Sequence, residues 1–145
     1  MLSALESWLD YIQQLHPVKW DLGLERVSRV GSMLGVEHPG GQVIVVAGTN
    51  GKGTTCEYLQ AMALAAGKKV GLTTSPHLIA YNERIRINGV AVADAQIVAA
   101  FEQIDAARGS ISLSYFEFSA LAAMLIFSEA AVDIAILEVG LGGRL

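Results

Sequence analysis

The sequence predicts an α/β protein: a three-layer sandwich in which helices cover both faces of a mostly parallel sheet that carries a phosphate-binding loop (P-loop). Three observations predict it. A β-branched run, Gln42–Ala47, has the pattern of a strand covered on both faces. A glycine-rich loop, Gly48–Thr54, follows directly and leads into a helical stretch. Hydrophobic residues make up 52% of the chain, and strands buried on both faces account for that surplus.

Composition excludes several classes of protein. The longest unbroken apolar run, Ala120–Phe127, has eight residues, whereas a bilayer needs about 20, so no membrane partner is expected. A net charge of −4 offers no general basic surface for nucleic acid. No export signal opens the chain, and its single cysteine, Cys56, suits a reducing compartment. The sequence therefore predicts a cytoplasmic protein.

The first 41 residues are predicted to form two helices. Ser3 and Glu6 have the spacing of a capping box, and apolar residues follow at helical spacing until Pro17. A second amphipathic helix carries apolar residues to Leu34, and Gly35 is its expected C-terminal cap. Residues 1–41 are thus a helical preface to an α/β core of residues 42–145.

The core is predicted from alternating strand and helix patterns. A helix from about Lys52 is closed by Gly67, and the strand 70–74 completes a βαβ unit. The segment 84–92 alternates and turns at Asn88–Gly89, which indicates a hairpin. Two more helices, after Asp94 and over about 115–130, precede a last strand, 132–139.

The glycine-rich loop has the features of a nucleotide site. Backbone N–H groups converge at such a turn, and the N-terminus of the following helix favours an anion. Lys52 would reach the β- and γ-phosphates, and Thr54 would donate its hydroxyl to Mg²⁺ or phosphate. The expected ATP-binding residues are Gly48, Thr49, Asn50, Gly51, Lys52, Gly53 and Thr54. The general pattern is shifted, because Val46 stands at the usual first glycine, so an ordinary glycine-rich βα turn is the alternative.

This loop is similar to the variant used by folylpolyglutamate and dihydrofolate synthases, within the Mur ligase superfamily. Four further segments agree with that family and stand in its order. They are Asp21–Val27, Ser75–Leu78 with Glu83–Arg84, Ser114–Glu117 and Leu137–Leu145. The resemblance runs from about Trp8 to the last residue and implies the central-domain fold of the Mur ligases.

The resemblance implies an ATP-dependent ligase of folate biosynthesis. ATP phosphorylates a pterin-linked carboxylate to an acyl phosphate, and the amine of L-glutamate then displaces phosphate to form an amide. The expected small-molecule partners are dihydropteroate or folate, glutamate and ATP, with Mg²⁺ as cofactor. The first step depends on positioning and on neutralising charge, for which Lys52 is the expected catalytic residue.

Ser75 and Glu138 are the Mg²⁺ ligands that the resemblance implies. Glu138 ends an apolar strand, where a carboxylate is costly unless it is paired or bound to metal; an ion pair with arginine is the alternative. Ser75 precedes proline and by itself indicates only a loop. The two side chains are expected within roughly 6 Å of each other, facing the Lys52 loop. His77 is assigned no role.

Two segments resemble the pterin-contacting parts of the family. The first is Asp21, Leu22, Gly23 and Leu24, for which helix capping by Asp21 is the alternative. The second is Ser114, Tyr115, Phe116 and Glu117. Phe116 either stacks on a pterin ring or packs under a helix.

The family continues beyond the segment that ends this chain, with an Asp-Ala-Thr-Asn segment, a metal-binding histidine, a modified lysine and a glutamate-binding C-terminal domain. The chain is therefore expected to be the N-terminal ATP-binding domain of a longer monomeric enzyme, truncated and inactive alone. Its incomplete sheet would expose an edge through which it self-associates. Two alternatives stay open: another Mur-type amino-acid ligase, although only 47 residues precede Gly48, and a non-catalytic P-loop nucleotide-binding module.

Overall fold

The structure is a computed structural model, and it describes residues 2–16 and 23–140. These residues form two compact units, which are considered separately. The helical unit comprises the chain up to residue 37 together with residues 94–126, and the sheet unit comprises residues 38–93 and the chain from residue 127 on.

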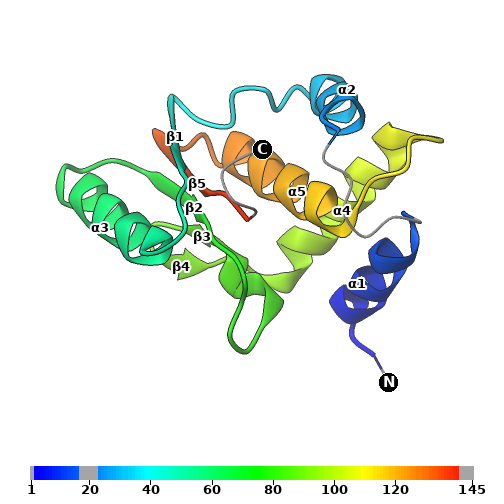
Figure 1. Cartoon of the computed structure of the whole chain (residues 1–145), viewed down its shortest axis with the longest axis horizontal. Coiled ribbons are helices and arrows are strands. Elements are labelled where there is room, and N and C mark those ends of the chain that lie inside the picture. The colour runs from blue at the N-terminus through cyan, green and yellow to red at the C-terminus, as the bar shows by residue number, and fades with distance from the viewer. Residues whose placement is uncertain (1, 17–22, 141–145) are drawn as a thin grey trace. The chain divides into compact units, whose positions relative to one another are not determined.

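The sheet unit contains a five-stranded sheet of order β1-β5-β2-β3-β4 (Figure 1). Its strands are β1 (Gln42–Val46), β2 (Val70–Thr73), β3 (Ile85–Ile87), β4 (Val90–Ala91) and β5 (Ile134–Glu138). Helix α3 (Lys52–Ala65) connects β1 to β2, and the short 3-10 helix η1 (Tyr81–Arg84) precedes β3. Strand β5 runs parallel to both β1 and β2, while β3 is antiparallel to β2 and to β4. Four of the five strands therefore point the same way, and the predicted mostly parallel α/β fold is confirmed.

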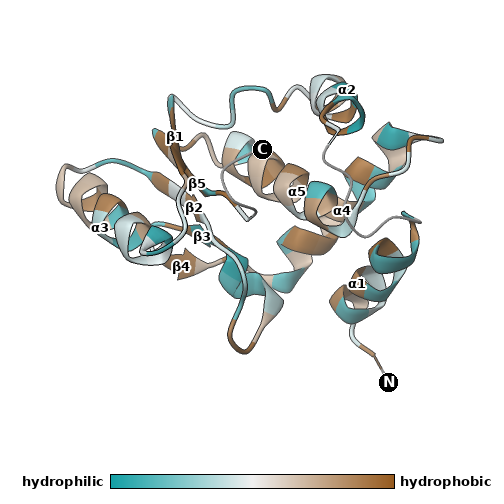
Figure 2. Ribbon diagram, viewed as in Figure 1, coloured by the Kyte–Doolittle hydropathy of each residue, from teal (hydrophilic) through white to brown (hydrophobic). Residues whose placement is uncertain are grey.

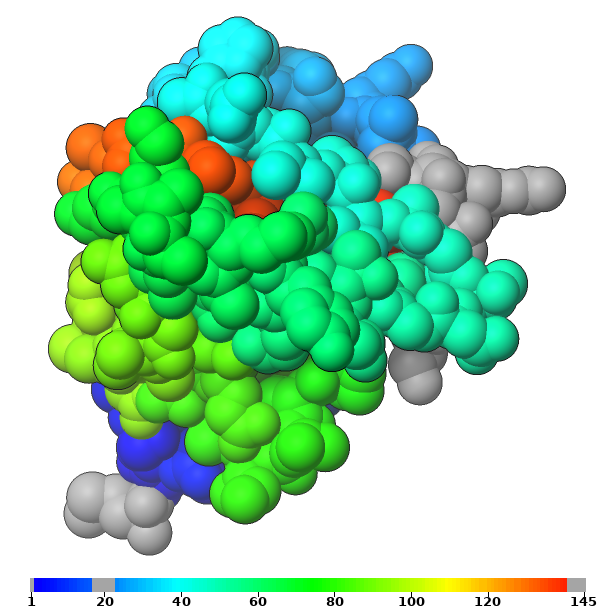
Figure 3. Space-filling view, turned by 90° about the vertical axis from the view of Figure 1, so that its left-hand side faces the viewer, coloured from blue at the N-terminus to red at the C-terminus, as the bar shows by residue number. Residues whose placement is uncertain are grey.

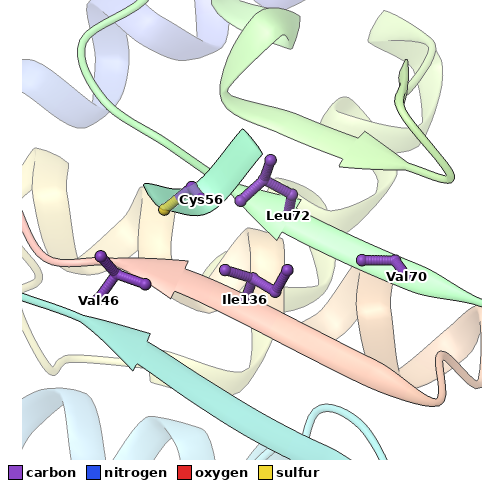
Figure 4. Packing of buried hydrophobic residues seen from close by; sticks show 5 residues of the cluster. All are labelled: Val46, Cys56, Val70, Leu72 and Ile136. Atoms are coloured by element: carbon purple, nitrogen blue, oxygen red, sulfur yellow. The ribbon is translucent and has the colours of Figure 1, made fainter. Parts of the chain in front are cut away.

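Helix α3 covers one face of this sheet. Its Cys56 is fully buried in a cluster with one or two residues from each of three strands, namely Val46, Val70, Leu72 and Ile136 (Figure 4). Successive side chains of a strand point to opposite faces, so the other face must be covered separately. Phe127, in the last turn of α5 (Tyr115–Glu129), packs there against Gly71. The sheet thus has helical residues on both faces.

Strand β1 departs from one expectation. It is rich in apolar residues, as Figure 2 shows, and was expected to be covered on both faces. Among the described residues it instead lies at the edge of the sheet, paired only with β5. Its Val43 and Val45 are 41% and 57% exposed, whereas Val46, on the α3 side, is buried. The two valines point to the face opposite α3 and stay exposed among the described residues, so this face of β1 lacks the cover that the sequence pattern predicts.

The predicted hairpin and helix ends of the sheet unit are confirmed. Asn88 and Gly89 both have positive φ, 51° and 80°. A two-residue hairpin turn needs these values for its backbone to match the right-handed twist of the flanking strands. Gly67, just after α3, has φ 74° and gives its N–H to the carbonyl of Leu64. Figure 3 shows the outer side of α3 at the molecular surface (turquoise to green), where Tyr58 and Met62 are exposed.

The helical unit consists of α1 (Ala4–Gln14), α2 (Glu25–Leu34), α4 (Asp94–Arg108) and α5 as far as residue 126. The Ser3–Glu6 capping box and the left-handed Gly35 cap are both present as predicted. Phe101 of α4 lies at the centre of the core, with its ring centroid 6.0 Å from that of Trp8 and 5.6 Å from that of Phe118. None of the described helices has the length and apolar character needed to cross a bilayer.

Candidate nucleotide and substrate sites

The phosphate loop joins β1 to α3 and is built from backbone. Gly48 has φ 147° and Gly51 has φ 75°, values that favour glycine, and Gly51 is the N-cap of α3. All residues from Ala47 to Gly51 are exposed, including Thr49 and Asn50. A Cβ placed on Gly51 or Gly53 would meet no atom within 4 Å, so open space lies over the loop. The first N–H groups of a 14-residue helix are therefore accessible to an anion.

Lys52 and Thr54 begin this helix with polar groups near the loop. The Lys52 ammonium donates to the carbonyl oxygen of Gly48 at 2.6 Å, so it lies over the loop. Contact with a phosphate there would require it to give up this bond. The Thr55 hydroxyl is occupied by the Gly51 carbonyl at 2.9 Å. The Thr54 hydroxyl is exposed and forms no hydrogen bond within the described part of the chain. Of the two threonines, Thr54 is the one whose hydroxyl can bind a metal or phosphate.

Strand pairing brings the two predicted metal ligands to the same end of the sheet, where the parallel strands have their carboxyl ends. Val46 is opposite Glu138 in the β1–β5 pair, and Thr73 is opposite Leu137 in the β2–β5 pair. Glu138 therefore ends the strand that lies between the phosphate loop and the segment carrying Ser75. Neighbouring strands lie about 4.8 Å apart, so three functional segments converge where these parallel strands end. The 6 Å separation of the Ser75 hydroxyl and the Glu138 carboxylate stays a prediction.

Glu138 lies on the face that α3 covers. It stands two residues after Ile136, so the two side chains share a face of β5, and Ile136 packs against Cys56. Burial raises the pKa of the Cys56 thiol to about 11, and the nearby Glu138 carboxylate adds to this shift. The side chain of Glu138 makes no ion pair or hydrogen bond within residues 2–16 and 23–140. These residues therefore do not support the alternative of an arginine partner.

The donor set suits Mg²⁺ better than a metal that needs several side-chain ligands. No group of three or more His, Cys, Asp or Glu side chains in the described residues could hold a metal ion. Mg²⁺ usually binds through one or two carboxylates, together with waters and substrate phosphates. One carboxylate, Glu138, and the hydroxyls of Thr54 and Ser75 are oxygen donors of this kind.

The loop after Ser75 is held by Glu83, a role that sequence reasoning missed. The Glu83 carboxylate accepts hydrogen bonds from the backbone N–H groups of Leu78, Ile79 and Ala80 at 2.7–2.9 Å. These bonds, those from Ala80 and Leu78 above all, hold the pKa of the Glu83 carboxyl below its usual value. The spacing of Glu83 three residues after Ala80 is the available signal, because a glutamate there can reach back to free amides.

His77, which had no predicted role, belongs to the same loop. Its Nδ1 accepts a hydrogen bond from the Arg84 Nε at 2.8 Å, and its ring meets that of Tyr81 edge to face at 5.9 Å. Leu78 and Ile79 are more than 90% exposed at the tip. His77 thus has a structural role in a loop that presents two apolar side chains.

Ser114 and Glu117, predicted to contact the pterin, form the capping box that begins α5. The Ser114 hydroxyl accepts from the Glu117 N–H at 3.2 Å, and the Glu117 carboxylate accepts from the Ser114 N–H at 2.8 Å. Both residues are buried, so their side chains are directed inward. The Ser-x-x-Glu spacing is the same signal that identified Ser3 and Glu6, and it was available in the sequence.

The other predicted pterin residues of the helical unit are more accessible. Gly23 and Leu24 are exposed, and Leu24 is the N-cap residue of α2, without a side-chain capping bond. Tyr115 and Phe116 are half-buried. Asp21 and Leu22 lie outside the described residues. The structure therefore assigns the cap position to Leu24 rather than to Asp21, the alternative considered for this segment.

Comparison with known proteins adds a close set of relatives, although no family model matches the chain. The dihydrofolate synthase/folylpolyglutamate synthase of Escherichia coli is 53% identical over 143 residues, which is 99% of this chain and 34% of that protein. The structure of Escherichia coli FolC in complex with DHPP and ADP has a TM-score of 0.96 and 51% identity, over 100% of this chain and 36% of that one.

A third relative is a bifunctional folylpolyglutamate synthase/dihydrofolate synthase with Mn, AMPPNP and L-glutamate bound. Its TM-score is 0.93 at 52% identity, over 99% of this chain and 34% of that one. The chain spans about a third of the length of the relatives that it matches. Identity of this level along nearly all of the chain extends well beyond the phosphate loop.

Proposed function

The chain belongs to the dihydrofolate synthase/folylpolyglutamate synthase family, and from that premise we propose that its protein is an ATP-dependent ligase of folate biosynthesis. The reaction joins the amine of L-glutamate to the carboxylate of dihydropteroate, of a folate, or of both. ATP is a substrate, and its γ-phosphoryl group activates the carboxylate as an acyl phosphate. Glutamate then displaces phosphate, which leaves an amide, ADP and phosphate.

The observation that carries the proposal is the convergence of three segments at the carboxyl ends of β1, β5 and β2. An exposed backbone loop for phosphates, a carboxylate without an ion-pair partner in the described part of the chain, and a hydroxyl lie at or near adjacent strand ends. Phosphoryl transfer needs charge neutralisation and alignment, and little covalent chemistry from the protein. The arrangement offers both charge neutralisation and alignment.

In this function the sheet unit binds ATP and Mg²⁺. The loop amides of Gly48–Thr54 cradle the phosphates, and the Lys52 ammonium offsets their negative charge. Thr54, Ser75 and Glu138 hold Mg²⁺, which, when bound, stabilises charge on the transferred phosphoryl group. Glu138 is suited to this role because it ends the strand next to β1 and its carboxylate has no cationic partner within residues 2–16 and 23–140.

The acceptor carboxylate is assigned to the helical unit. Asp21, Leu22, Gly23 and Leu24 before α2, and Tyr115 and Phe116 at the start of α5, are the proposed pterin contacts. The aromatic rings of Tyr115 and Phe116 offer stacking surfaces for a pterin. Ser114 and Glu117 act by shaping the start of α5, since their polar atoms are engaged with each other.

The organisation of the whole protein is part of the proposal. We take residues 1–145 as its ATP-binding domain, with a helical preface (1–41) and a phosphate-loop core (42–145). The glutamate-binding residues are expected in a further domain, as the length of the relatives suggests. A cytoplasmic, monomeric enzyme is proposed, with Cys56 reduced. The 145-residue chain alone is expected to self-associate through the exposed edge of β1.

The test is a ligation assay on the full-length protein. With ATP, Mg²⁺, L-glutamate and either dihydropteroate or tetrahydrofolate, we expect an amide product together with ADP and phosphate in equal amounts. The 145-residue chain alone should form no amide. Omitting either the pterin or the glutamate provides the control.

Two results would contradict the proposal. A rate of ATP hydrolysis that depends on neither pterin nor glutamate would indicate a P-loop module of another kind. Amide formation with a different acceptor, and none with pterins, would indicate another amino-acid ligase.

A further inference from the structure

A polar network in the helical unit joins segments that are far apart in the sequence. The Arg26 Nε donates to the carbonyl oxygen of Ser112 at 3.1 Å, and its Nη2 donates to Oε1 of Glu117 at 2.9 Å. The hydroxyl of Ser112 is 3.0 Å from Nδ1 of His16. Arg26 lies 86 residues from Ser112 and 91 from Glu117, so one guanidinium links the start of α2 to the turn before α5.

Glu117 is the buried centre of this network. Its side chain is 8% exposed, and its two oxygens have different partners: Arg26 for Oε1 and the Ser114 N–H for Oε2. A buried carboxylate requires such partners, because its charge is costly to desolvate. The position of the first turn of α5 is therefore coupled to the position of Arg26.

The network lies between the two segments proposed to contact the pterin. Gly23 and Leu24 come directly before α2, and Arg26 is in the first turn of that helix. Tyr115 and Phe116 lie between the two members of the α5 capping box. The residues at the network are inward or half-buried, while Gly23 and Leu24 are exposed. The network therefore adjoins both segments along the chain, and its residues are less exposed than Gly23 and Leu24.

We propose that Arg26 is a positioning residue for the pterin: its guanidinium fixes the spacing of the Gly23–Leu24 and Tyr115–Phe116 segments, and thereby the affinity for the carboxylate substrate. The inference rests on the proposed function. Nucleotide binding is not involved, since the phosphate loop belongs to the sheet unit.

The geometry requires arginine rather than any cation. A guanidinium donates from several nitrogens in a fixed fork, and here two of them serve acceptors on different residues. A lysine ammonium at the same position is a point donor on a flexible stem. It keeps the charge beside Glu117 but holds the Ser112 carbonyl less rigidly.

The first experiment compares Arg26→Lys with a matched variant, Arg29→Lys, in the full-length protein. Arg29 lies on the same helix, is exposed, and has no partner within residues 2–16 and 23–140. We expect Arg26→Lys to raise KM for dihydropteroate by roughly ten- to a hundredfold, the size of effect that a misplaced contact produces. KM for ATP should be unchanged in both variants, and Arg29→Lys should match the parent in both KM values.

The second experiment separates positioning from stability. Arg26→Met leaves the Glu117 carboxylate buried without its cation and is expected to lower Tm. The double variant Arg26→Met/Glu117→Gln removes both charges but keeps a side-chain oxygen for the Ser114 N–H, so it should recover much of the lost Tm, because no unpaired charge stays buried. Its KM for dihydropteroate should stay raised, because the link between the two segments is still absent.

Three outcomes would overturn the inference. They are an unchanged dihydropteroate KM in Arg26→Lys, an equal rise in the KM for ATP, and a double variant that recovers both Tm and KM. The last would show that Arg26 only balances the charge of Glu117. Failure of the proposed function is distinguishable, because the parent protein itself would then show no dependence on dihydropteroate; that result removes both proposals.

Discussion

The phosphate loop of the sheet unit consists of seven consecutive residues, whereas the candidate pterin site of the helical unit is supported by a side-chain contact across 91 residues of chain. The loop needs only that Gly48 and Gly51 adopt positive φ and that a helix follows. The helical site needs Arg26, Ser112 and Glu117 to meet. Local backbone preference specifies the first site, and packing of the whole unit specifies the second.

This difference predicts which substitutions act locally and which act at a distance. In the sheet unit, single loop residues should affect nucleotide binding with little effect on folding. In the helical unit, residues that never touch a ligand should still alter its affinity, as proposed for Arg26. Five predictions test the comparison, beginning with the largest expected effect.

Lys52→Ala should abolish ATP binding by the full-length protein. Its ammonium lies over the loop, and without it the phosphates lose the charge-assisted hydrogen bond that offsets their negative charge. Titration calorimetry with ATP and Mg²⁺ measures the binding. Lys68→Ala, just beyond α3, is the control and should bind as the parent does; equal affinities in Lys52→Ala and the parent would refute the role.

Gly71→Ala should destabilise the sheet unit while leaving the loop chemistry intact. A Cβ at this position would lie 2.5 Å from Cδ1 of Phe127, well inside van der Waals contact. Overpacking of this kind costs about 1–3 kcal/mol, which thermal unfolding measures as a lower Tm.

Gly53→Ala is the matched opposite of Gly71→Ala. Its Cβ would meet no atom, and alanine in α3 favours the helix by up to about 1 kcal/mol. Stability should be kept or raised, and ATP affinity should fall, because the methyl group enters the open space above the loop. A Gly53→Ala variant with parental ATP affinity would argue against phosphate binding at this point.

Ser3→Ala and Ser114→Ala compare two capping boxes with the same bonds and different surroundings. The Ser3 box is exposed, and its loss should cost about 1 kcal/mol of stability, as for ordinary N-caps. The Ser114 box is buried and shares its glutamate with Arg26, so its loss should cost more. Urea unfolding of both variants provides the comparison, and equal losses would show that the network adds nothing.

The smallest effect is expected in the Glu83 loop and depends on pH. The pKa of Glu83 is lowered in the folded chain, so its contribution is present above the unfolded value of 4.5 and is lost as the pH falls through the lower folded pKa. Amide exchange at Leu78, Ile79 and Ala80, corrected for intrinsic rates, should accelerate relative to the rest of the unit in that acidic window. Glu83→Gln should show the faster exchange at neutral pH, and protection unchanged by either condition would contradict the assignment.

Much of the sheet unit could be predicted, but the surroundings of β1 could not. The pattern of Gln42–Val46 specifies a strand, and the alternation of strands and helices predicts a mostly parallel sheet. The pairing of β1 with β5 rather than with β2 came from the structure. The same pattern predicted cover on both faces, which the described sheet does not supply to Val43 and Val45. A periodic pattern records which residues favour burial, and it contains no information on which segment buries them.

The sequence alone determined the phosphate loop, the hairpin at Asn88–Gly89 and most helix ends of this protein, because glycine freedom, capping and hydrophobic period act over a few neighbouring residues. Only the tertiary structure brought Glu138 and the Ser75 segment to the edge beside the loop, since the strand order β1-β5-β2 inserts the last strand between the first two. It also showed that Glu117 points inward to Arg26, whereas the family resemblance alone implies a pterin contact at this residue. Such pairings depend on the free energy of packing distant segments together. Burying the Glu117 carboxylate costs desolvation energy, and this cost is offset only when packing places the guanidinium of Arg26 beside it.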